Sequence, residues 1–377
     1  MTGFFKSIKT YFLLLILLAP AALYAQSGFF WEQPAVFSQA HAHFPVTASN
    51  GDFGIVVWQE PMLGPEAGDA SIGIALAVKL PGQPWENRGI IGGPYIYSDM
   101  EPSILSAVID DRNRILIAAA ASTAEIEILI SEDMGRTFER FRLESGPESS
   151  LAPRISVASD GSYLLFISRG SGDSISIFFS RSADGRFWEP FRPFITVPGI
   201  HLNFLPSHAS LRGRDYVVFQ SFTASSKGIN LFQLYVTISS DGGRTWSPPQ
   251  LFTSFQDPHI NAAAAADGFD NQRPHLSLQG DSLFLVWERR YHTGVPQIYA
   301  ARLGPDGFIA GLPERVNSVT AHCNNPVAIN FGGQTKIVWF DNRRGFNRIF
   351  MARRTGPWWE ETELSRGSGD TFGRPVV

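Results

Sequence analysis

The sequence predicts an all-β protein, a β-propeller of six four-stranded blades, or of seven with the last one incomplete. Composition is the first observation behind this prediction. The 377 residues include 35 glycines, 25 prolines and 13% aromatic residues, which is typical of chains with many turns between strands. The second is a proline followed by a short apolar run, which recurs at intervals of about 50 residues. The third is the tight turn and second apolar run that follow each of these prolines.

The recurring proline marks the first strand of each unit. It occurs at Pro45, Pro102, Pro153, Pro206, Pro274 and Pro326, and again near the end of the chain at Pro375. We expect each proline to be the first residue of its strand, where a missing N–H costs no ladder hydrogen bond. The six complete units then run over 43–93, 101–146, 152–196, 204–253, 272–317 and 324–365.

Each unit continues with three further strands. The second strands are the apolar runs 55–58, 115–117, 163–167, 216–219, 283–287 and 336–339, reached through turns such as SNGD and SDGS that suit hairpins. Third strands follow, for example at 175–180, 234–238 and 298–301. A tryptophan or phenylalanine next to proline or glutamate often announces the fourth. Four antiparallel strands per unit describe a propeller blade.

The two ends of the chain carry blade fragments. Residues 30–37 are similar to a fourth strand, and residues 374–377 are similar to a first strand. Two interpretations stay open. The ends complete a ring of six blades with a short extra seam, or the chain is cut within a seventh blade and the natural protein continues.

A distinctive turn lies between the third and fourth strands of several units. Its pattern is Ser-x-Asp-x-Gly-x-Thr-aromatic, complete at 239–246 and 131–138 and one residue shorter at 182–188. Serine and aspartate side chains bond the backbone of such a turn, glycine allows positive φ, and the aromatic ring fills the space between neighbouring sheets. The structural residues of these turns are Ser131, Asp133, Gly135, Asp184, Ser239, Asp241, Gly243 and Trp246.

With these turns in register with the blade repeat, the chain resembles the Asp-box (BNR-repeat) β-propellers of the sialidase-like superfamily. In that family the box lies on the face opposite the active site, which implies a structural role for the box aspartates. Sialidases hold a carboxylate with three arginines and use a Tyr–Glu nucleophile and an aspartate acid/base. The first of their arginines belongs to a Phe/Tyr-Arg-Ile-Pro motif. Here the first unit reads His43-Phe44-Pro45, so the catalytic sialidase motif is not matched at the first blade.

Polar residues at the starts of first strands and after second strands are the ligand-binding candidates, because these positions converge on one face of a propeller. They are Glu101, Arg273, His275, Glu288, Arg289, Asp341, Arg343 and Arg374. The acids of the stretches 287–291 and 339–344 either bind sugar hydroxyls or act as acid/base, or else pair with a neighbouring arginine as a brace. No catalytic residue is assigned.

Residues 1–25 read as a signal peptide: Lys6 and Lys9, an apolar run over 11–18, and small residues ending at Ala25. Residues 26–377 form the propeller domain. We therefore expect export to the periplasm, cell surface or medium and no membrane-spanning segment after cleavage. The net charge of −4 offers no basic field for nucleic acid, and lone Cys323 rules out an intrachain disulfide. No cofactor and no metal site is expected.

Two functional hypotheses follow. The first is a monomeric exported propeller that binds a carbohydrate or a cell-envelope partner on its axial face, without evident catalysis. The alternative is a glycoside hydrolase, exo-sialidase-like, acting on extracellular glycans. Fold alone does not choose between them, so whether the protein is an enzyme is left open.

Overall fold

The computed structural model describes residues 43–62, 71–96, 104–146, 150–171, 174–195, 202–224, 230–253, 269–291, 294–331 and 334–365. The chain divides into two compact units, 1–37 and 38–377, and all of these residues belong to the second. They form strands and turns, and none of their segments is a helix that is long and apolar enough to cross a membrane. The proposed signal peptide and the fragments 30–37 and 374–377 lie outside the described residues.

The strands make six four-stranded sheets. The first two sheets contain β1 (His43–Asn50), β2 (Phe53–Met62), β3 (Ser71–Lys79), β4 (Trp85–Ile96), β5 (Leu105–Ile109), β6 (Ile115–Ala120), β7 (Glu125–Ser131) and β8 (Glu139–Glu144). The next two contain β9 (Ser150–Val157), β10 (Tyr163–Ser171), β11 (Ser174–Ser182), β12 (Arg192–Pro193), β13 (Asn203–Leu211), β14 (Arg214–Ala224), β15 (Asn230–Ser239) and β16 (Gln250–Leu251). The last two contain β17 (Phe269–Gln279), β18 (Ser282–Tyr291), β19 (Gln297–Leu303), β20 (Glu314–Arg315), β21 (Cys323–Phe331), β22 (Gln334–Asp341), β23 (Arg348–Thr355) and β24 (Trp358–Glu363).

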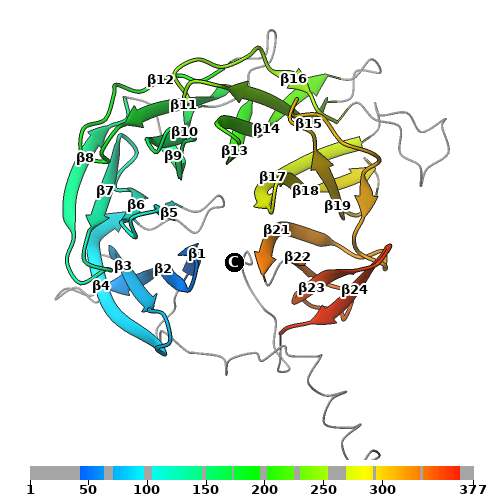
Figure 1. Ribbon diagram of the computed structural model, residues 1–377, viewed down its shortest axis with the longest axis horizontal. Coiled ribbons are helices and arrows are strands. Elements are labelled where there is room, and N and C mark those ends of the chain that lie inside the picture. Colours follow the sequence, from blue (N-terminus) through cyan, green and yellow to red (C-terminus); the bar gives the residue numbers. More distant parts are fainter. Residues whose placement is uncertain are drawn as a thin grey trace, which may run out of the picture. The chain divides into compact units, whose positions relative to one another are not determined.

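Every sheet is an antiparallel meander in which the strands lie in chain order. Figure 1 shows the six sheets arranged around a common centre, with β1, β5, β9, β13, β17 and β21 innermost. The predicted all-β propeller of six four-stranded blades is confirmed. Antiparallel order also places the β1–β2 and β3–β4 turns at one end of a blade, and the β2–β3 loop and the connection to the next blade at the other.

In five of the six sheets the repeated proline lies inside the first strand, so the expectation that it opens the strand is wrong there. Pro102 and Pro375 lie outside the described residues. In the first sheet His43 pairs with Gln59 and Val46 with Val57, which leaves Phe44 and Pro45 opposite a single residue, Trp58. The same β-bulge occurs at four further prolines, in β9, β13, β17 and β21. A bulge accommodates the proline because its residues need not donate to the ladder.

The residue before each of these prolines has a left-handed backbone. The φ angles are 48° at Phe44, 56° at Ala152, 54° at Leu205, 50° at Arg273 and 51° at Asn325. Such angles are uncommon for residues with a side chain, and a bulge re-aims that side chain. The bulges therefore redirect one side chain in each of five first strands, which are the innermost strands of their blades.

The turns between third and fourth strands make the hydrogen bonds expected from their residues. The Asp241 carboxylate accepts bonds from the backbone of Arg244 and Thr245, at 3.0 and 2.9 Å, and the Ser239 hydroxyl accepts one from Gly243 at 2.9 Å. The equivalent bonds form at 131–137 and 182–187. These turns are rigid, self-bonded units.

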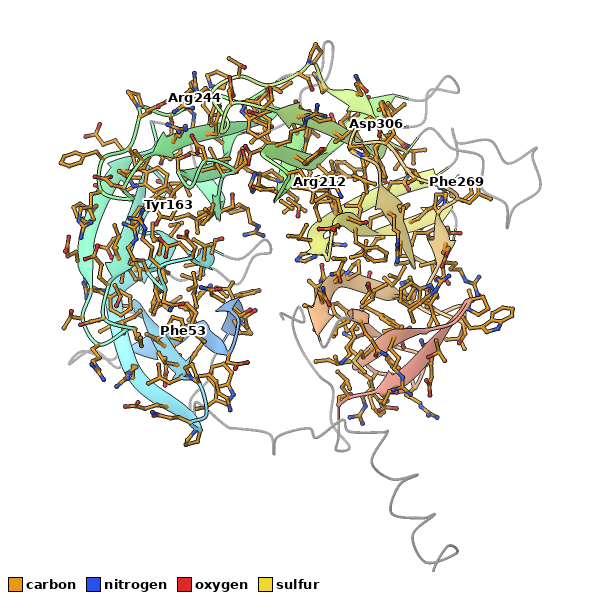
Figure 2. All side chains as sticks on the ribbon, in the orientation of Figure 1. Phe53, Tyr163, Arg212, Arg244, Phe269 and Asp306 are labelled. Carbon is orange, nitrogen blue, oxygen red and sulfur yellow. The ribbon has the colours of Figure 1, made fainter. Side chains whose placement is uncertain are left out.

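Each of these turns also docks onto the preceding sheet. A Cβ atom on Gly243 would stand 2.7 Å from Cδ2 of Leu164 in the third sheet. The Trp246 ring lies 5.1 Å, centroid to centroid, from that of Phe194, also in the third sheet. Figure 2 accordingly shows Arg244 beside the third sheet and Asp306, in the turn after β19, beside the fourth. The apolar clusters likewise span neighbouring sheets, so core packing rather than a disulfide joins the blades.

Candidate functional site

A cavity of about 410 Å³ lies at the centre of the propeller, and we refer to it as the central cavity. Residues from the first strands of all six sheets line it. Its walls are mainly apolar and include Phe44, Leu105, Ile155, Phe204, Leu205 and Leu276. Its volume falls within the range of small-molecule sites, about 300–1,000 Å³.

A second cavity of about 230 Å³ lies between the fifth and sixth sheets, and we refer to it as the charged pocket. It is lined by Asp270, Gln272, Arg273, Glu288, Arg290, Pro296, His322 and Asn324. These residues come from the start of β17, the end of β18 and the segments before β19 and at the start of β21. The charged pocket is thus at the end of the blades opposite the Ser-x-Asp turns.

Strand alternation explains which side chains reach the charged pocket. In the β17–β18 hairpin Asp270 pairs with Arg290, and Gln272 pairs with Glu288. Cross-strand partners point to the same face, and so do residues two apart along a strand. All four therefore share one face, and Arg289 points to the other.

Glu288 links the fifth sheet to the sixth. Glu288 is 4% exposed. One of its carboxylate oxygens accepts a hydrogen bond from the Arg273 guanidinium at 2.9 Å, and the other accepts one from the backbone N–H of Asn325 at 2.6 Å. Gln220 occupies the same register position in the fourth sheet and accepts a bond from the Arg273 amide at 2.8 Å. In both cases a side chain of one sheet holds the bulge of the next.

Asp270 is the second buried carboxylate of the charged pocket. One oxygen accepts a bond from the Phe232 amide at 2.8 Å, and the other accepts bonds from Gln272 at 2.5 Å and from Nε and Nη2 of Arg290 at 3.0 and 2.9 Å. All of these partners are donors. Asp270 is therefore fixed in place as a hydrogen-bond acceptor, and so is Glu288.

Of the candidates predicted from the sequence, Arg273 and Glu288 come together in the charged pocket, and His275 lines the central cavity. His275 Nδ1 lies 3.2 Å from the backbone N–H of Ala328 and accepts its hydrogen bond. Glu101 and Arg374 lie outside the described residues.

The remaining candidates line neither cavity. Arg289 is 1% exposed and lies over the Phe269 ring, 3.9 Å from its centroid. Asp341 is fully buried and pairs with Arg343 at 2.6 Å, and Arg343 pairs in turn with Glu361. These contacts are those of the bracing interpretation rather than of a ligand site.

Sequence reasoning missed Asp270, Gln272, Arg290, His322 and Asn324. Asp270 fell outside the predicted fifth unit because that unit was expected to begin at residue 272. A period of two along the Trp287–Tyr291 stretch would have grouped Arg290, not Arg289, with Glu288. Nothing local in the sequence places His322 or Asn324 beside them.

Tyr95 and Tyr163, both in the described part of the chain, donate hydrogen bonds to carboxylates, the pairing that a sialidase-like nucleophile would need. Tyr95 of β4 donates to Glu127 of β7, and Tyr163 of β10 donates to Asp110 at 2.6 Å. Both pairs lie outside the two cavities. Burial, and then the bond to the carboxylate, raises the pKa of each phenol. They are protonated interior contacts between neighbouring sheets.

No group of three histidine, cysteine or acidic side chains able to hold a metal ion occurs within the described ranges. Burial is also the main cause that raises the pKa of the Cys323 thiol, and Asp341 adds to it. The sulfur is therefore a neutral thiol packed in the sixth sheet.

Fold and cavities together define a six-bladed β-propeller with a polar pocket at one end of its blades. No protein-family model matches the sequence, and no curated protein matches it either. Solved structures do. A protein of unknown function from Dyadobacter fermentans is 14% identical with a TM-score of 0.54, over 85% of this chain and 93% of that one.

Two further similar structures are glycoside hydrolases. The α-L-arabinanase of Penicillium chrysogenum, complexed with arabinobiose, is 12% identical with a TM-score of 0.51, over 82% of this chain and 90% of that one. The NanB sialidase of Streptococcus pneumoniae is 10% identical with a TM-score of 0.52, over 83% of this chain and 67% of that one. At such identities the likeness shows a shared propeller fold.

Proposed function

We propose that this protein is an exported, sialidase-like propeller that binds a carbohydrate in the charged pocket without hydrolysing it. The observation that carries the proposal is the hydrogen bonding of the two buried carboxylates, Asp270 and Glu288. In both Asp270 and Glu288 each carboxylate oxygen accepts a hydrogen bond from a protein donor, so each carboxylate is a fixed acceptor at the base of the pocket. A hydroxyl-rich ligand suits such a site because each hydroxyl both donates and accepts.

The rim of the pocket supplies the complementary groups. The side chain of Arg290 is 48% exposed and that of Arg273 is 33% exposed, so both side chains are partly accessible from solvent. Exposed His322 and half-buried Asn324 face them from the sixth sheet. Fixed acceptors below and accessible donors above are the elements of sugar recognition.

Hydrolysis is the less supported alternative. Glycoside hydrolysis requires one carboxylic acid that gives a proton to the leaving group. In Asp270 and Glu288 both carboxylate oxygens accept hydrogen bonds from protein donors, an arrangement that suits a fixed acceptor better than a proton donor. The presence of two carboxylates in one pocket, and the arabinanase and sialidase among the similar structures, are what favour this alternative. Export rests on the proposed signal peptide at residues 1–25.

The test is calorimetric titration of the protein with a neutral sugar, arabinobiose, and an acidic one, sialyllactose. Arg290→Gln removes an accessible donor from the pocket, and we expect it to weaken binding about tenfold or more. Arg142→Gln is the matched control, because Arg142 lies on β8, the outer strand of the second sheet, is 64% exposed and pairs with Glu125 of β7. We expect this control to bind like the unmodified protein.

Fluorogenic arabinofuranoside and sialoside substrates separate the two functions. We expect no turnover of either. Turnover that disappears in Glu288→Gln would replace the binding proposal with the hydrolase. Absence of binding to both sugars would overturn the carbohydrate proposal itself.

A further inference from the structure

The central cavity differs in chemistry from the charged pocket. Among the described residues that line it there is no aspartate or glutamate, and the two charged ones are Arg154 and Arg273. Most of the wall is carbon: rings, branched aliphatic side chains and three bulge prolines. A polar ligand alone gains little from such a wall, whereas an apolar group gains from leaving water.

Two of the bulges contribute to this apolar wall. Phe44 and Leu205 have the left-handed φ angles of 48° and 54° and line the cavity. Backbone conformations of this kind are costly for residues with side chains, and they persist where the surrounding fold imposes them. Of the described residues, four left-handed bulge residues line the cavity: Phe44 and Leu205 place apolar side chains there, and Arg273 and Asn325 are polar.

A rigid aromatic wall stands next to the charged pocket. The rings of Phe204 and Phe232 meet edge to face with centroids 5.2 Å apart, and the Phe222 ring lies 4.9 Å from that of Phe232. Phe204 and Phe232 line the central cavity. Asp270 of the charged pocket accepts the bond from the Phe232 amide, so one residue fixes both the polar site and the aromatic wall.

The two cavities meet at Gln272 and Arg273, which line both. We propose that the central cavity binds an apolar group, of one or two aromatic rings, that is attached to the sugar held in the charged pocket. The ligand class is thus an aryl glycoside. Only the sugar half of this ligand rests on the carbohydrate binding proposed above.

Size is consistent with this occupant. An apolar cavity of about 150 Å³ is enough to bind benzene, and the central cavity measures about 410 Å³. Transfer of one aromatic ring from water into such a wall increases affinity by about one to two orders of magnitude. We therefore expect 4-nitrophenyl arabinofuranoside to bind at least about tenfold more tightly than the methyl arabinofuranoside.

The apolar half is tested without any sugar. N-phenyl-1-naphthylamine, an uncharged fluorophore, should bind the full chain with increased fluorescence. Ala107→Phe fills part of the cavity from β5, in the second sheet, and should weaken this binding about tenfold or more. Ala310→Phe, at an exposed position after β19, is the matched control and should leave it unchanged.

Ser156→Leu is a second cavity-filling variant, in case Ala107→Phe does not fold. Ser156 lines the cavity, and its hydroxyl makes no hydrogen bond within the described part of the chain, so its loss costs little. Fluorophore binding that is absent, or that survives both substitutions, overturns the apolar site. Fluorophore binding without any binding of the methyl arabinofuranoside or sialyllactose leaves the apolar site standing and removes the sugar proposal instead.

Discussion

Glu288 shows how one residue serves both the fold and the pocket. Its carboxylate holds the Asn325 amide in the next sheet and the Arg273 guanidinium in its own. Gln220 performs the first of these tasks one blade earlier with a neutral side chain. The hydrogen bond from the backbone N–H of the next blade therefore needs only an acceptor oxygen. The negative charge of Glu288 serves Arg273 and the pocket.

This division of labour predicts different costs for two substitutions. Glu288→Ala leaves a buried amide without an acceptor, and we expect the free energy of unfolding to fall by about 3 kcal/mol. Glu288→Gln keeps an oxygen in the arrangement that Gln220 uses, so we expect a loss of about 1 kcal/mol. Urea denaturation measures both. Equal losses would mean that the bond to Arg273, and not the bond to Asn325, carries the stability.

The sequence predicts some residues of the charged pocket and not their neighbours. Arg273 and Glu288 were identified because the position of each in the repeat points to the open end of a blade. Arg289 was chosen over Arg290, although the alternation of side chains along β18 turns it to the other face. Asp270 and His322 join the pocket only through contacts between separate strands, which no local pattern encodes.

Among the elements, the Ser-x-Asp turns and the first strands behave differently as sequence signals. The turns could be predicted in detail because their hydrogen bonds join residues within about four positions of one another. The start of a first strand could not, because the bulge at its proline is defined by pairing with the second strand. Residues 269–271 and 150–151 therefore belong to strands that were expected to start later.

Gly243 of the Ser-x-Asp turn allows a positive φ angle and also leaves room for Leu164 of the third sheet. A matched pair of substitutions separates these two roles. Gly213 and Gly243 have similar φ angles, 74° and 78°, but a Cβ on Gly213 meets nothing within 4 Å, whereas one on Gly243 meets buried Leu164. We expect Gly213→Ala to cost about 1 kcal/mol through backbone strain alone. Gly243→Ala should cost about 2 kcal/mol more because it overpacks the junction with the third sheet. Urea unfolding of both variants measures the difference, and equal costs would show that the turn does not press on that sheet.

For the whole molecule, the two ends of the blades differ in electrostatic character. One end carries the charged pocket. The other carries every described aspartate with a lowered pKa: Asp110, Asp133, Asp160, Asp184, Asp215 and Asp241. In Asp133 and Asp241 the bond from the turn threonine is the main cause. In Asp215 burial opposes ionisation, and bonds from His208, Ser159 and Ser210 outweigh it.

These aspartates predict where the protein loses stability with pH. Each has a lower pKa in the folded chain than the ordinary value of about 3.9, so the unfolded chain binds protons first as the pH falls. Their contribution is complete above that ordinary value and is lost as the pH decreases through the folded values. We expect the free energy of unfolding, measured in urea from about pH 7 to about pH 3, to stay level and then to fall steeply below about pH 4.

Asp215→Asn tests the source of this fall. Asp215 is fully buried and accepts bonds from the Ser159 backbone and hydroxyl at 2.7 and 2.6 Å. Its amide replacement cannot be protonated in this range, so the variant should be less stable at neutral pH but lose less stability on acidification than the unmodified protein. An unchanged acid dependence would place the sensitivity elsewhere. The other five aspartates of the turn end, whose pKa values are also lowered, would then be the first to replace in the same way.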